Sequence, residues 1–350
     1  MKIVCIGGGT GLPILLRGIS QVSHSSSGAS DEISLTAVVC VSDNGGSSGV
    51  LRRYFGIPAV GDLRNCLVAL ASSSSPLGDL FQHRMGQGNA LSGHALGNLV
   101  VTALCERTGS LLEAVSQAAV LLQSRGSVLP STEQPVTLCA EFEDGAVVRG
   151  EVEIARRMAP IARVWLEPRA LVATPGLAAA ILSADMVVFG PGSLYTSIIP
   201  NLLVPGIAET VRRSEAMKVL VCNLMTQPGE TDGFTASDHL RVLEQHCGEG
   251  IIDACVLNSS PVNCEGSEGN AGGGRPVEND VEEIMRYGTI PVVADLLLRE
   301  SSRVRHDPAK LAAVIALLGR ERESRLGSEY ETFPSMEEPV AEEQVMLAAG

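Results

Sequence analysis

The first twelve residues constrain the fold of this chain more than any other stretch. Residues 2–6 are apolar and of strand type, residues 7–11 read GGGTG, and residues 12–19 have the composition of a helix. Glycine tolerates positive φ and lacks a Cβ, so such a turn lets backbone N–H groups approach an anion at the positive end of the following helix. The stretch therefore predicts a strand, a tight turn and a helix with a phosphate site. The residues expected at this site are Gly8, Gly9, Thr10, Gly11 and Leu12.

The spacing of these glycines matches no complete nucleotide fingerprint. Gly7 and Gly9 satisfy the first half of the dinucleotide pattern, but Leu12 stands where its third glycine would be. No Gly-Lys-Ser/Thr follows, which excludes a Walker-type loop. A purely structural role for the glycines, in packing the turn, stays open as the alternative.

Composition narrows the class of protein and of partner. The 350 residues are 45% hydrophobic but only 3% aromatic, which favours a core of Ala, Val, Leu and Ile such as buried parallel sheets have. The net charge of −14 argues against nucleic acid or an anionic membrane as the main partner. An anionic ligand must therefore be held locally, by glycine turns, helix ends or a metal ion.

Cysteine usage and hydropathy predict a cytoplasmic protein. The nine cysteines form no C-x-x-C pair, so we expect reduced, mostly buried thiols and no zinc site. No signal peptide is evident at the N-terminus. The longest uncharged run, residues 186–208, is interrupted by glycines and prolines, so no membrane insertion is expected.

A second strand-like run also ends in polar residues. Residues 33–41 are apolar and lead into SDNGGSSG at 42–49. Asp43 and Asn44 would then lie at the carboxyl edge of the sheet, where open α/β sheets bind ligands. An Asx-turn is the alternative interpretation of this pair.

Two helix starts carry further candidate contacts. Asp62 is well placed as a first-turn acid or cap, but Arg64 and Asn65 in the same turn are less readily explained by capping. His94 and Asn98 are four residues apart and would share one helix face. Ligand contact and a structural role both stay open for that pair.

A second glycine turn follows a second buried strand. Residues 185–189 are strand-like and end in Gly190, Pro191 and Gly192. The hydroxyls that follow, of Ser193, Thr196 and Ser197, would offer donors to an anion at a helix start. Two such turns indicate an anion site more strongly than one.

The remaining pattern predicts alternating strands and helices and a polar tail. A β-hairpin is expected over 137–142 and 147–152, surface loops over 20–31 and 263–274, and an acidic, poorly ordered tail over 320–350. Further strands are expected at 161–166, 218–223, 252–258 and 290–295, and helices at 66–71, 111–123, 176–183, 238–246 and 308–318.

Seven blocks of sequence together resemble a known family. They are GGGTGL at 7–12, SDNGGSSG at 42–49, GDLRN at 61–65, GHALGN at 93–98, FGPGSLYTSIIPNLL at 189–203, NLMTQPGET at 223–231 and RHDP at 305–308. In this order the set resembles the bacterial gluconeogenesis factor family (YvcK-like), which is itself similar to the 2-phospho-L-lactate transferases (CofD-like).

The resemblance implies a fold, a ligand and a cellular role. The fold would be a Rossmann-like, doubly wound α/β domain over residues 1–319, with a mostly parallel sheet and a small hairpin and helical insertion. The ligand would be a nucleotide or UDP-sugar, and the role would be regulation of gluconeogenesis and of cell wall or cell shape. The matching blocks add Thr226, Gln227 and Arg305 to the candidate ligand contacts.

The resemblance also frames the question of catalysis. In the related transferases acidic residues hold Mg²⁺ against substrate phosphates, and the matching positions here are Asp43 and Asp62. Asn44 and Arg64 stand where those enzymes carry more acids, which favours a binding protein over a Mg²⁺-dependent transferase. An NAD-dependent oxidoreductase is a third hypothesis, disfavoured by the missing fingerprint glycine. A homodimer stays open, and the sequence names no protein target.

Overall fold

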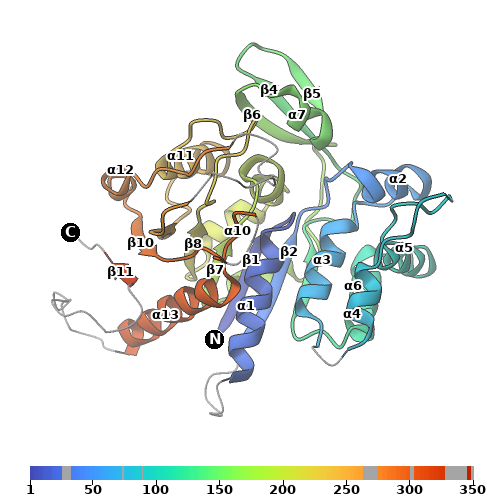
Figure 1. The fold of residues 1–350 in the computed structure, drawn as a ribbon, viewed down its shortest axis with the longest axis horizontal. Helices are drawn as coiled ribbons and strands as arrows, with labels where there is room; N and C mark the ends of the chain where they lie inside the picture. The colour runs from blue at the N-terminus through green and yellow to red at the C-terminus, as the bar shows by residue number, and fades with distance from the viewer. Residues whose placement is uncertain are drawn as a thin grey trace.

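The core of the protein is an eight-stranded, mostly parallel sheet, seen in the computed structural model in Figure 1. The structure describes residues 1–25, 33–72, 75–88, 90–262, 274–299, 303–327 and 345–347. The strand order is β11-β10-β9-β8-β7-β1-β2-β3, and only β11 is antiparallel to its neighbour. The strands are β1 (Lys2–Gly7), β2 (Ser34–Val39), β3 (Ser127–Pro130), β7 (Met186–Phe189), β8 (Met217–Val221), β9 (Ala254–Asn258), β10 (Ile290–Ala294) and β11 (Val345–Leu347).

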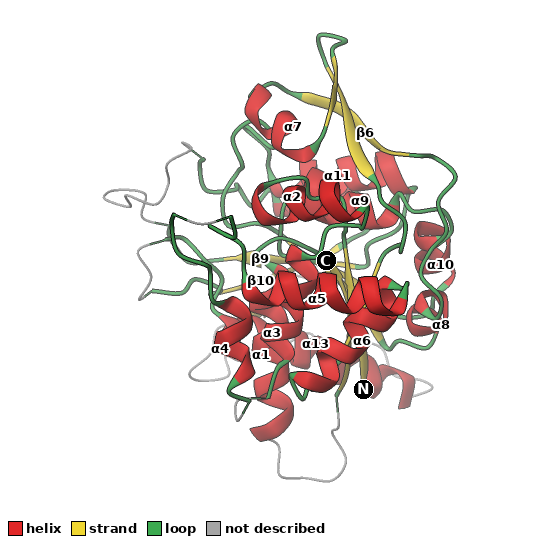
Figure 2. Ribbon diagram, turned by 90° about the vertical axis from the view of Figure 1, so that its right-hand side faces the viewer, coloured by secondary structure: helices red, strands yellow, loops and turns green. Residues whose placement is uncertain are grey.

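Helices cover both faces of this sheet, as Figures 1 and 2 show. One layer contains α1, α3 and α13, which pack against one another, and a second contains α8, α9 and α10. The helices are α1 (Leu12–Ser25), α2 (Gly46–Phe55), α3 (Gly61–Leu70), α4 (Leu77–Gln82), α5 (Leu96–Thr108), α6 (Leu111–Leu121), α7 (Glu151–Arg157), α8 (Leu177–Leu182), η1 (Leu194–Ile198), α9 (Ile199–Leu202), α10 (Ile207–Arg213), α11 (Ala236–Cys247), α12 (Val281–Arg286) and α13 (Pro308–Gly327). The predicted doubly wound α/β class is confirmed.

Burial on both faces explains why the central strands are almost continuously apolar. All four residues of β7 are buried, and in β1 only Lys2 is exposed. The chain leaves β1 toward β2 on one side, while β7 lies on the other side of β1. In sheets of this class the usual ligand position is at such a change of direction, outside the carboxyl ends of the two strands, here β1 and β7.

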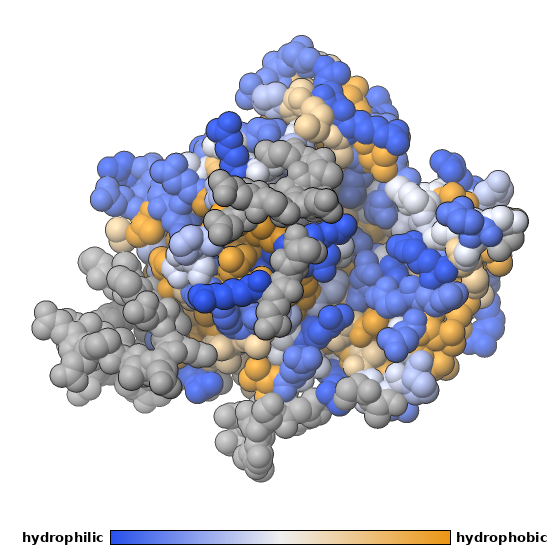
Figure 3. Space-filling model, viewed as in Figure 1, coloured by the Kyte–Doolittle hydropathy of each residue, from blue (hydrophilic) through white to orange (hydrophobic). Residues whose placement is uncertain are grey.

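A small antiparallel sheet projects from the main body, at the top of Figure 1. It consists of β4 (Thr137–Phe142), β5 (Val147–Arg149) and β6 (Ile161–Glu167), together with α7, and we call residues 137–167 the insertion. Its surface is largely hydrophilic on the face seen in Figure 3. The predicted hairpin is confirmed, but its second strand ends at Arg149, because Gly150 (φ 99°) turns the chain into α7.

Several boundaries differ from those predicted. Helix α1 continues to Ser25, so residues 20–25 of the predicted loop are helical, and the rest of that loop lies outside the described residues. Helix α2 was not predicted, because its glycines are typical of a loop. Gly49 is required there, since a Cβ would lie 1.9 Å from the Asn44 carbonyl oxygen. Helix α13 extends beyond residue 319 to Gly327. The predicted loop over 263–273 and most of the predicted tail lie outside the described residues.

Two further findings concern the cysteines and the possibility of a membrane-spanning helix. The eight described cysteines are free and buried, as predicted for reduced thiols. Within the described part of the chain, no helix has the length and apolar character needed to cross a bilayer.

The two glycine turns pack directly on each other. A Cβ at Gly11 would lie 2.3 Å from the carbonyl oxygen of Pro191, and one at Gly192 would lie 3.5 Å from that of Gly8. The packing role that the sequence left open therefore accounts for Gly11. The turns after β1 and β7 form one continuous surface at the sheet edge.

We predict that Gly11→Ala lowers the free energy of unfolding by about 1–3 kcal/mol, because the new methyl group must displace a backbone carbonyl. Gly78→Ala is the matched control, since Gly78 lies in α4 and nothing approaches its Cβ position within 4 Å. Alanine there should be neutral or stabilise the helix by up to about 1 kcal/mol. Urea denaturation of both variants provides the comparison, and equal stabilities would contradict the packing argument.

Candidate functional site

The first glycine turn is joined to the start of α3 by a hydrogen bond. The Gly9 amide donates to Asp62 Oδ2 over 2.6 Å, and Gly9 has a φ of 63°. A Cβ at Gly8 would lie 2.9 Å from the same carboxylate oxygen, so a larger residue there would displace it. One N–H that the sequence assigned to a phosphate thus donates to a carboxylate in this structure.

Asp62 is a half-buried acid with a perturbed pKa. Burial raises the pKa of Asp62 to about 6, and the negative charge of Asp43 adds to this effect. The Gly9 amide, Arg64 and the Asn65 side chain act in the opposite direction. An anion that approaches the turn therefore meets a carboxyl group that is partly ionised near neutral pH.

Asp43 is fixed by the loop that follows β2. Its Oδ1 accepts the Gly45 amide over 2.8 Å, as expected for an Asx-turn. The guanidinium of Arg52 donates to the carbonyl oxygens of Ser42 (2.7 Å) and Asp43 (2.9 Å). Asp43 Oδ2 lies 3.8 Å from the Cβ position of Gly61, beside the start of α3. The two acids predicted to hold Mg²⁺ are thus neighbours.

Asn44 connects the same loop to the insertion. Its Oδ1 accepts the Val152 amide over 3.0 Å, and its Nδ2 donates to Glu153 Oε2 over 2.8 Å. Both ends of this amide are engaged by α7. In this structure the residue predicted as a ligand contact tethers the insertion.

His94 and Asn98 meet at a serine of α2. The Ser47 hydroxyl lies 2.9 Å from His94 Nδ1 and accepts from Asn98 Nδ2 over 3.0 Å. Asn98 is buried, and its Oδ1 has no hydrogen-bond partner. The predicted shared helix face is wrong, because α5 begins at Leu96 and His94 precedes it. The two side chains nevertheless meet at Ser47, where they position the first turn of α2.

Arg64 is a buried cation beside Asp62. Its guanidinium donates to Gln82 Oε1, while its buried Nε has no hydrogen-bond partner. Burial, with a smaller contribution from Arg84, lowers the pKa of Arg64 to about 10, so it stays charged at neutral pH. Arg64 therefore acts on this site through its charge.

Internal hydrogen bonds hold the second glycine turn. Asn223 accepts from the Gly192 amide (3.2 Å) and donates to the Gly192 carbonyl oxygen (2.9 Å). Ser193 Oγ donates to Glu230 and accepts from Thr196 Oγ1 over 2.7 Å. Ser197 Oγ lies 3.3 Å from the Cβ position of Gly9 and so connects this turn to the first.

The three contacts that came from the family resemblance are not equally close. Gln227 Oε1 accepts from Asn223 Nδ2 over 3.3 Å, which places it beside the second turn. Thr226 Oγ1 accepts the Arg275 amide over 2.9 Å. Arg305 is exposed on the segment before α13, beyond β10, which lies three strands from β7.

The sequence reasoning missed two acids. Burial raises the pKa of Glu151 and of Glu230, and for Glu151 the charges of Asp43, Asp62 and Glu230 raise it further. Glu230 belongs to the NLMTQPGET block, and that could have been a signal. Glu151 is the first residue of α7, and no sequence signal places the insertion beside Asp43.

The side chains that could ligate Mg²⁺ form only part of a metal site. Within the described ranges, no three His, Cys, Asp or Glu side chains lie close enough to form a metal site on their own. Mg²⁺ is commonly held by one or two carboxylates and completed by substrate phosphates and water. Asp43 and Asp62 fit that arrangement, provided that a ligand supplies the remaining oxygens.

We predict that Asp62→Asn changes how stability depends on pH. The pKa of Asp62 is about 6 in the folded protein, and about 3.9 is usual in unfolded chains. The native state thus binds more protons between these values, and the stability contributed by Asp62 falls as pH rises through that window. Between pH 4 and pH 7 the free energy of unfolding of Asp62→Asn should therefore rise by on the order of 2 kcal/mol relative to that of the wild type. Urea denaturation at several pH values measures this gain.

Asp79→Asn is the control for this experiment, since Asp79 is an exposed acid in the first turn of α4. It shows the effect of replacing an exposed aspartate by asparagine. A pH dependence of Asp62→Asn that is no larger than that of Asp79→Asn would contradict the assignment.

Comparison with known proteins identifies the family. Residues 3–297 match the family described as 2-phospho-L-lactate transferase CofD. The gluconeogenesis factor of Bacillus subtilis is 43% identical over 321 residues, which are 91% of this chain and 98% of that protein. A putative gluconeogenesis factor of Aquifex aeolicus is 45% identical over 320 residues, covering 90% and 95% of the two chains. A crystal structure of a UPF0052 family protein from Bacillus halodurans superposes with a TM-score of 0.84 at 41% identity, covering 90% and 98%. The chain belongs to the CofD family and, within it, to the group of the gluconeogenesis factors.

Proposed function

We propose that the protein binds a nucleotide diphosphate of the UDP-sugar type at the two glycine turns and acts as a regulator of carbon metabolism. One observation carries the proposal: the turns after β1 and β7 pack on each other and face Asp43 and Asp62, at the position where such sheets bind ligands. The name of the relatives, gluconeogenesis factor, supports the metabolic role. A role in cell-wall or cell-shape control belongs to the proposal through the family resemblance alone.

Electrostatics specify how a phosphate would be held. Asp62 and Asp43 repel an anion, and Arg64 compensates only part of this charge. A bound Mg²⁺ would neutralise the phosphates and the two carboxylates together. Among the chain's own residues, Arg52 holds the Asp43 loop in place, and the positive φ of Gly9 keeps the first turn free of a side chain.

The state of the hydrogen-bond donors favours a regulator over an enzyme. Catalytic sites present donors that are preorganised toward the transition state. Here the Gly9 amide, the Ser193 hydroxyl and the Asn44 amide donate to acids of the protein itself. A ligand must exchange these bonds for its own, and the exchange at Asn44 would reach the insertion. Such a site converts binding into a change of structure.

A Mg²⁺-dependent transferase is the second candidate. The observation in its favour is that Glu151 and Glu230 join Asp43 and Asp62, so the structure supplies acids that the sequence comparison had missed. Mg²⁺-dependent release of a nucleotide product from a UDP-sugar, lost in Asp62→Asn, would decide for the transferase.

We expect UDP-sugars to raise the melting temperature when Mg²⁺ is present. Occupancy at 100 times the dissociation constant adds about 2.7 kcal/mol of stability. A thermal-shift panel of UDP-sugars, UDP and NAD, each with Mg²⁺ and with EDTA, measures this effect. The absence of stabilisation by any of them at millimolar concentration would overturn the proposal, and a preference for NAD would favour a dinucleotide-binding protein.

The Asp43→Asn substitution reports whether a metal ion takes part. If Mg²⁺ lies between Asp43 and the phosphates, the variant should bind UDP-sugar about tenfold more weakly in Mg²⁺, because a charged ligand of the ion is lost. In EDTA the same change removes a repulsive charge and should leave binding unchanged or improve it. Isothermal titration calorimetry with and without Mg²⁺ shows whether the substitution weakens or strengthens binding in each condition. Weaker binding in both conditions would show that Asp43 contacts the ligand without a metal.

The Gly9→Ala substitution separates ligand contact from backbone strain. Gly9 and Gly109 both have positive φ (63° and 71°), so alanine at either position should cost roughly 1 kcal/mol of stability. Gly109 caps the far end of α5, and nothing lies within 4 Å of its Cβ position. Only Gly9→Ala should weaken UDP-sugar binding, because its methyl group enters the phosphate turn. Equal affinities of the two variants would contradict this role of Gly9.

A further inference from the structure

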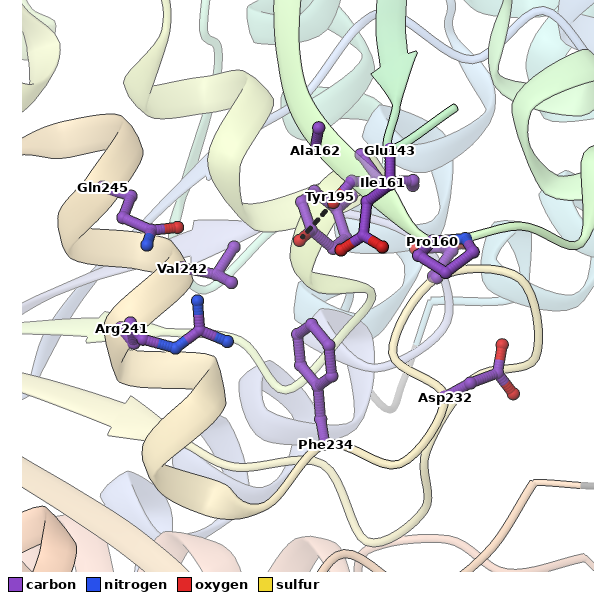
Figure 4. A pocket seen from close by; sticks show the side chains of 11 residues that line it. Glu143, Pro160, Ile161, Ala162, Tyr195, Asp232, Phe234, Arg241, Val242 and Gln245 are labelled. Atoms are coloured by element: carbon purple, nitrogen blue, oxygen red, sulfur yellow. Dashed lines mark hydrogen bonds between the residues drawn. The ribbon is translucent and has the colours of Figure 1, made fainter. Parts of the chain in front are cut away.

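A cavity lies between the insertion and α11, and it adjoins the second glycine turn through Glu230. Its volume is about 150 Å³, and it is shown in Figure 4. Its base is formed by Ile161, Tyr195 and Val242, all buried. The Tyr195 hydroxyl donates to the Ile161 carbonyl oxygen over 3.4 Å, which closes this base. The ring of Phe234 forms an apolar wall, 6.5 Å from the ring of Tyr195.

Opposite charges face each other across this cavity. In Figure 4 the Glu143 carboxylate, from the insertion, and the Arg241 guanidinium, from α11, both point into the space above Phe234. No ion pair joins these two side chains in the described structure, where Arg241 pairs with Asp238 over 2.8 Å. A guanidinium has five donors, so Arg241 retains some for a ligand. Glu230 and Asp232 line the same cavity, so that three carboxyl groups surround it.

We propose that this cavity binds a free α-amino acid with an apolar side chain. The ammonium group would be held by Glu143 and Glu230, and the carboxylate by Arg241. The side chain would pack against Phe234 and the apolar base. The size of the cavity supports this class, because pockets for drug-sized ligands start at roughly 300 Å³ and this one has room only for a small molecule.

The chemistry of the walls excludes the main alternatives. A phosphate would meet three carboxyl groups and only one guanidinium, which is already shared with Asp238. A simple amine would leave Arg241 without a new partner, and a simple carboxylic acid would leave Glu143 without one. Only a zwitterion complements both charged walls at once.

The location of the cavity suggests what occupancy would do. It lies where the insertion meets the main body, next to the hydrogen bond from the Val164 amide to His246 Nε2 (3.1 Å). Glu230 also accepts from Ser193 at the second glycine turn. An amino acid bound here would therefore hold the insertion in place and touch the nucleotide site through Glu230. The proposal concerns a separate ligand and does not require the proposed function.

The test uses the full chain without nucleotide and three small molecules that carry the same branched apolar group. Leucine carries both charges, 3-methylbutylamine only the ammonium, and 4-methylpentanoate only the carboxylate. Isothermal titration should give a millimolar dissociation constant for leucine and about tenfold weaker binding for each analogue, because each loses one charge-assisted contact. Equal affinity for all three would overturn the proposal, as would failure of alanine, leucine and phenylalanine to bind.

Two variants assign the charged walls. Glu143→Gln should weaken the binding of leucine about tenfold and leave the binding of 4-methylpentanoate unchanged. Arg241→Gln should weaken the binding of leucine and leave the binding of 3-methylbutylamine unchanged. Glu141→Gln and Arg286→Gln are the controls, since each removes one partner of an ion pair outside the cavity. Circular dichroism confirms folding. Unchanged leucine affinity in both folded cavity variants would place any binding elsewhere.

Discussion

The hydrogen bond from the Gly9 amide to Asp62 is the contact on which the candidate site depends. It joins the turn after β1 to the first turn of α3 over 2.6 Å, and it keeps a carboxylate where an anion would otherwise bind. Asp43 raises the pKa of Asp62, and with Asp62 it raises that of Glu151, so these acids behave as one electrostatic unit. The negative field of this unit opposes the entry of an anion. If a phosphate binds here, as we propose, a cation or a proton has to compensate its charge.

The insertion makes this unit sensitive to structure elsewhere. Asn44 bonds the start of α7 to the Asp43 loop, and Glu151 stands at the same helix start. On the other side, the Val164 amide donates to His246 of α11. The antiparallel sheet is thus attached to the main body at two points that flank the carboxylates. Any ligand that breaks the Asn44 contacts alters the position of Glu151 and so the charge near Asp62.

The sequence allowed the fold class and the central strands of the main sheet to be predicted, because strands buried on both faces leave an unambiguous apolar pattern. The two edge strands of that sheet, β3 and β11, were not predicted. The glycine turns were equally visible, because each interrupts an apolar run, and Gly9 has the positive φ that favours glycine. The contact of Gly11 with Pro191, however, joins residues far apart in sequence and could not be predicted. Helix α2 was not predicted either, because Gly49 serves a contact with the Asn44 carbonyl that only the folded chain reveals. Glu151 was missed for a related reason: its distance to Asp43 depends on how the insertion folds back, and no local pattern encodes that. The roles found for Asn44 and His94, in holding α7 and Ser47, likewise follow from contacts between residues far apart in sequence.

The balance between regulator and enzyme follows from what the donors do before a ligand arrives. An enzyme gains rate only from interactions that are stronger in the transition state than in the ground state, and it gains most when its donors need no rearrangement. At this site the donors of Gly9, Ser193 and Asn44 already serve carboxylates of the protein, so the free energy of ligand binding must first release them. That cost lowers affinity, but it couples occupancy to the position of the insertion. In a protein whose role is to report a metabolite such coupling is the function, whereas in a transferase the same rearrangement would oppose the chemical step.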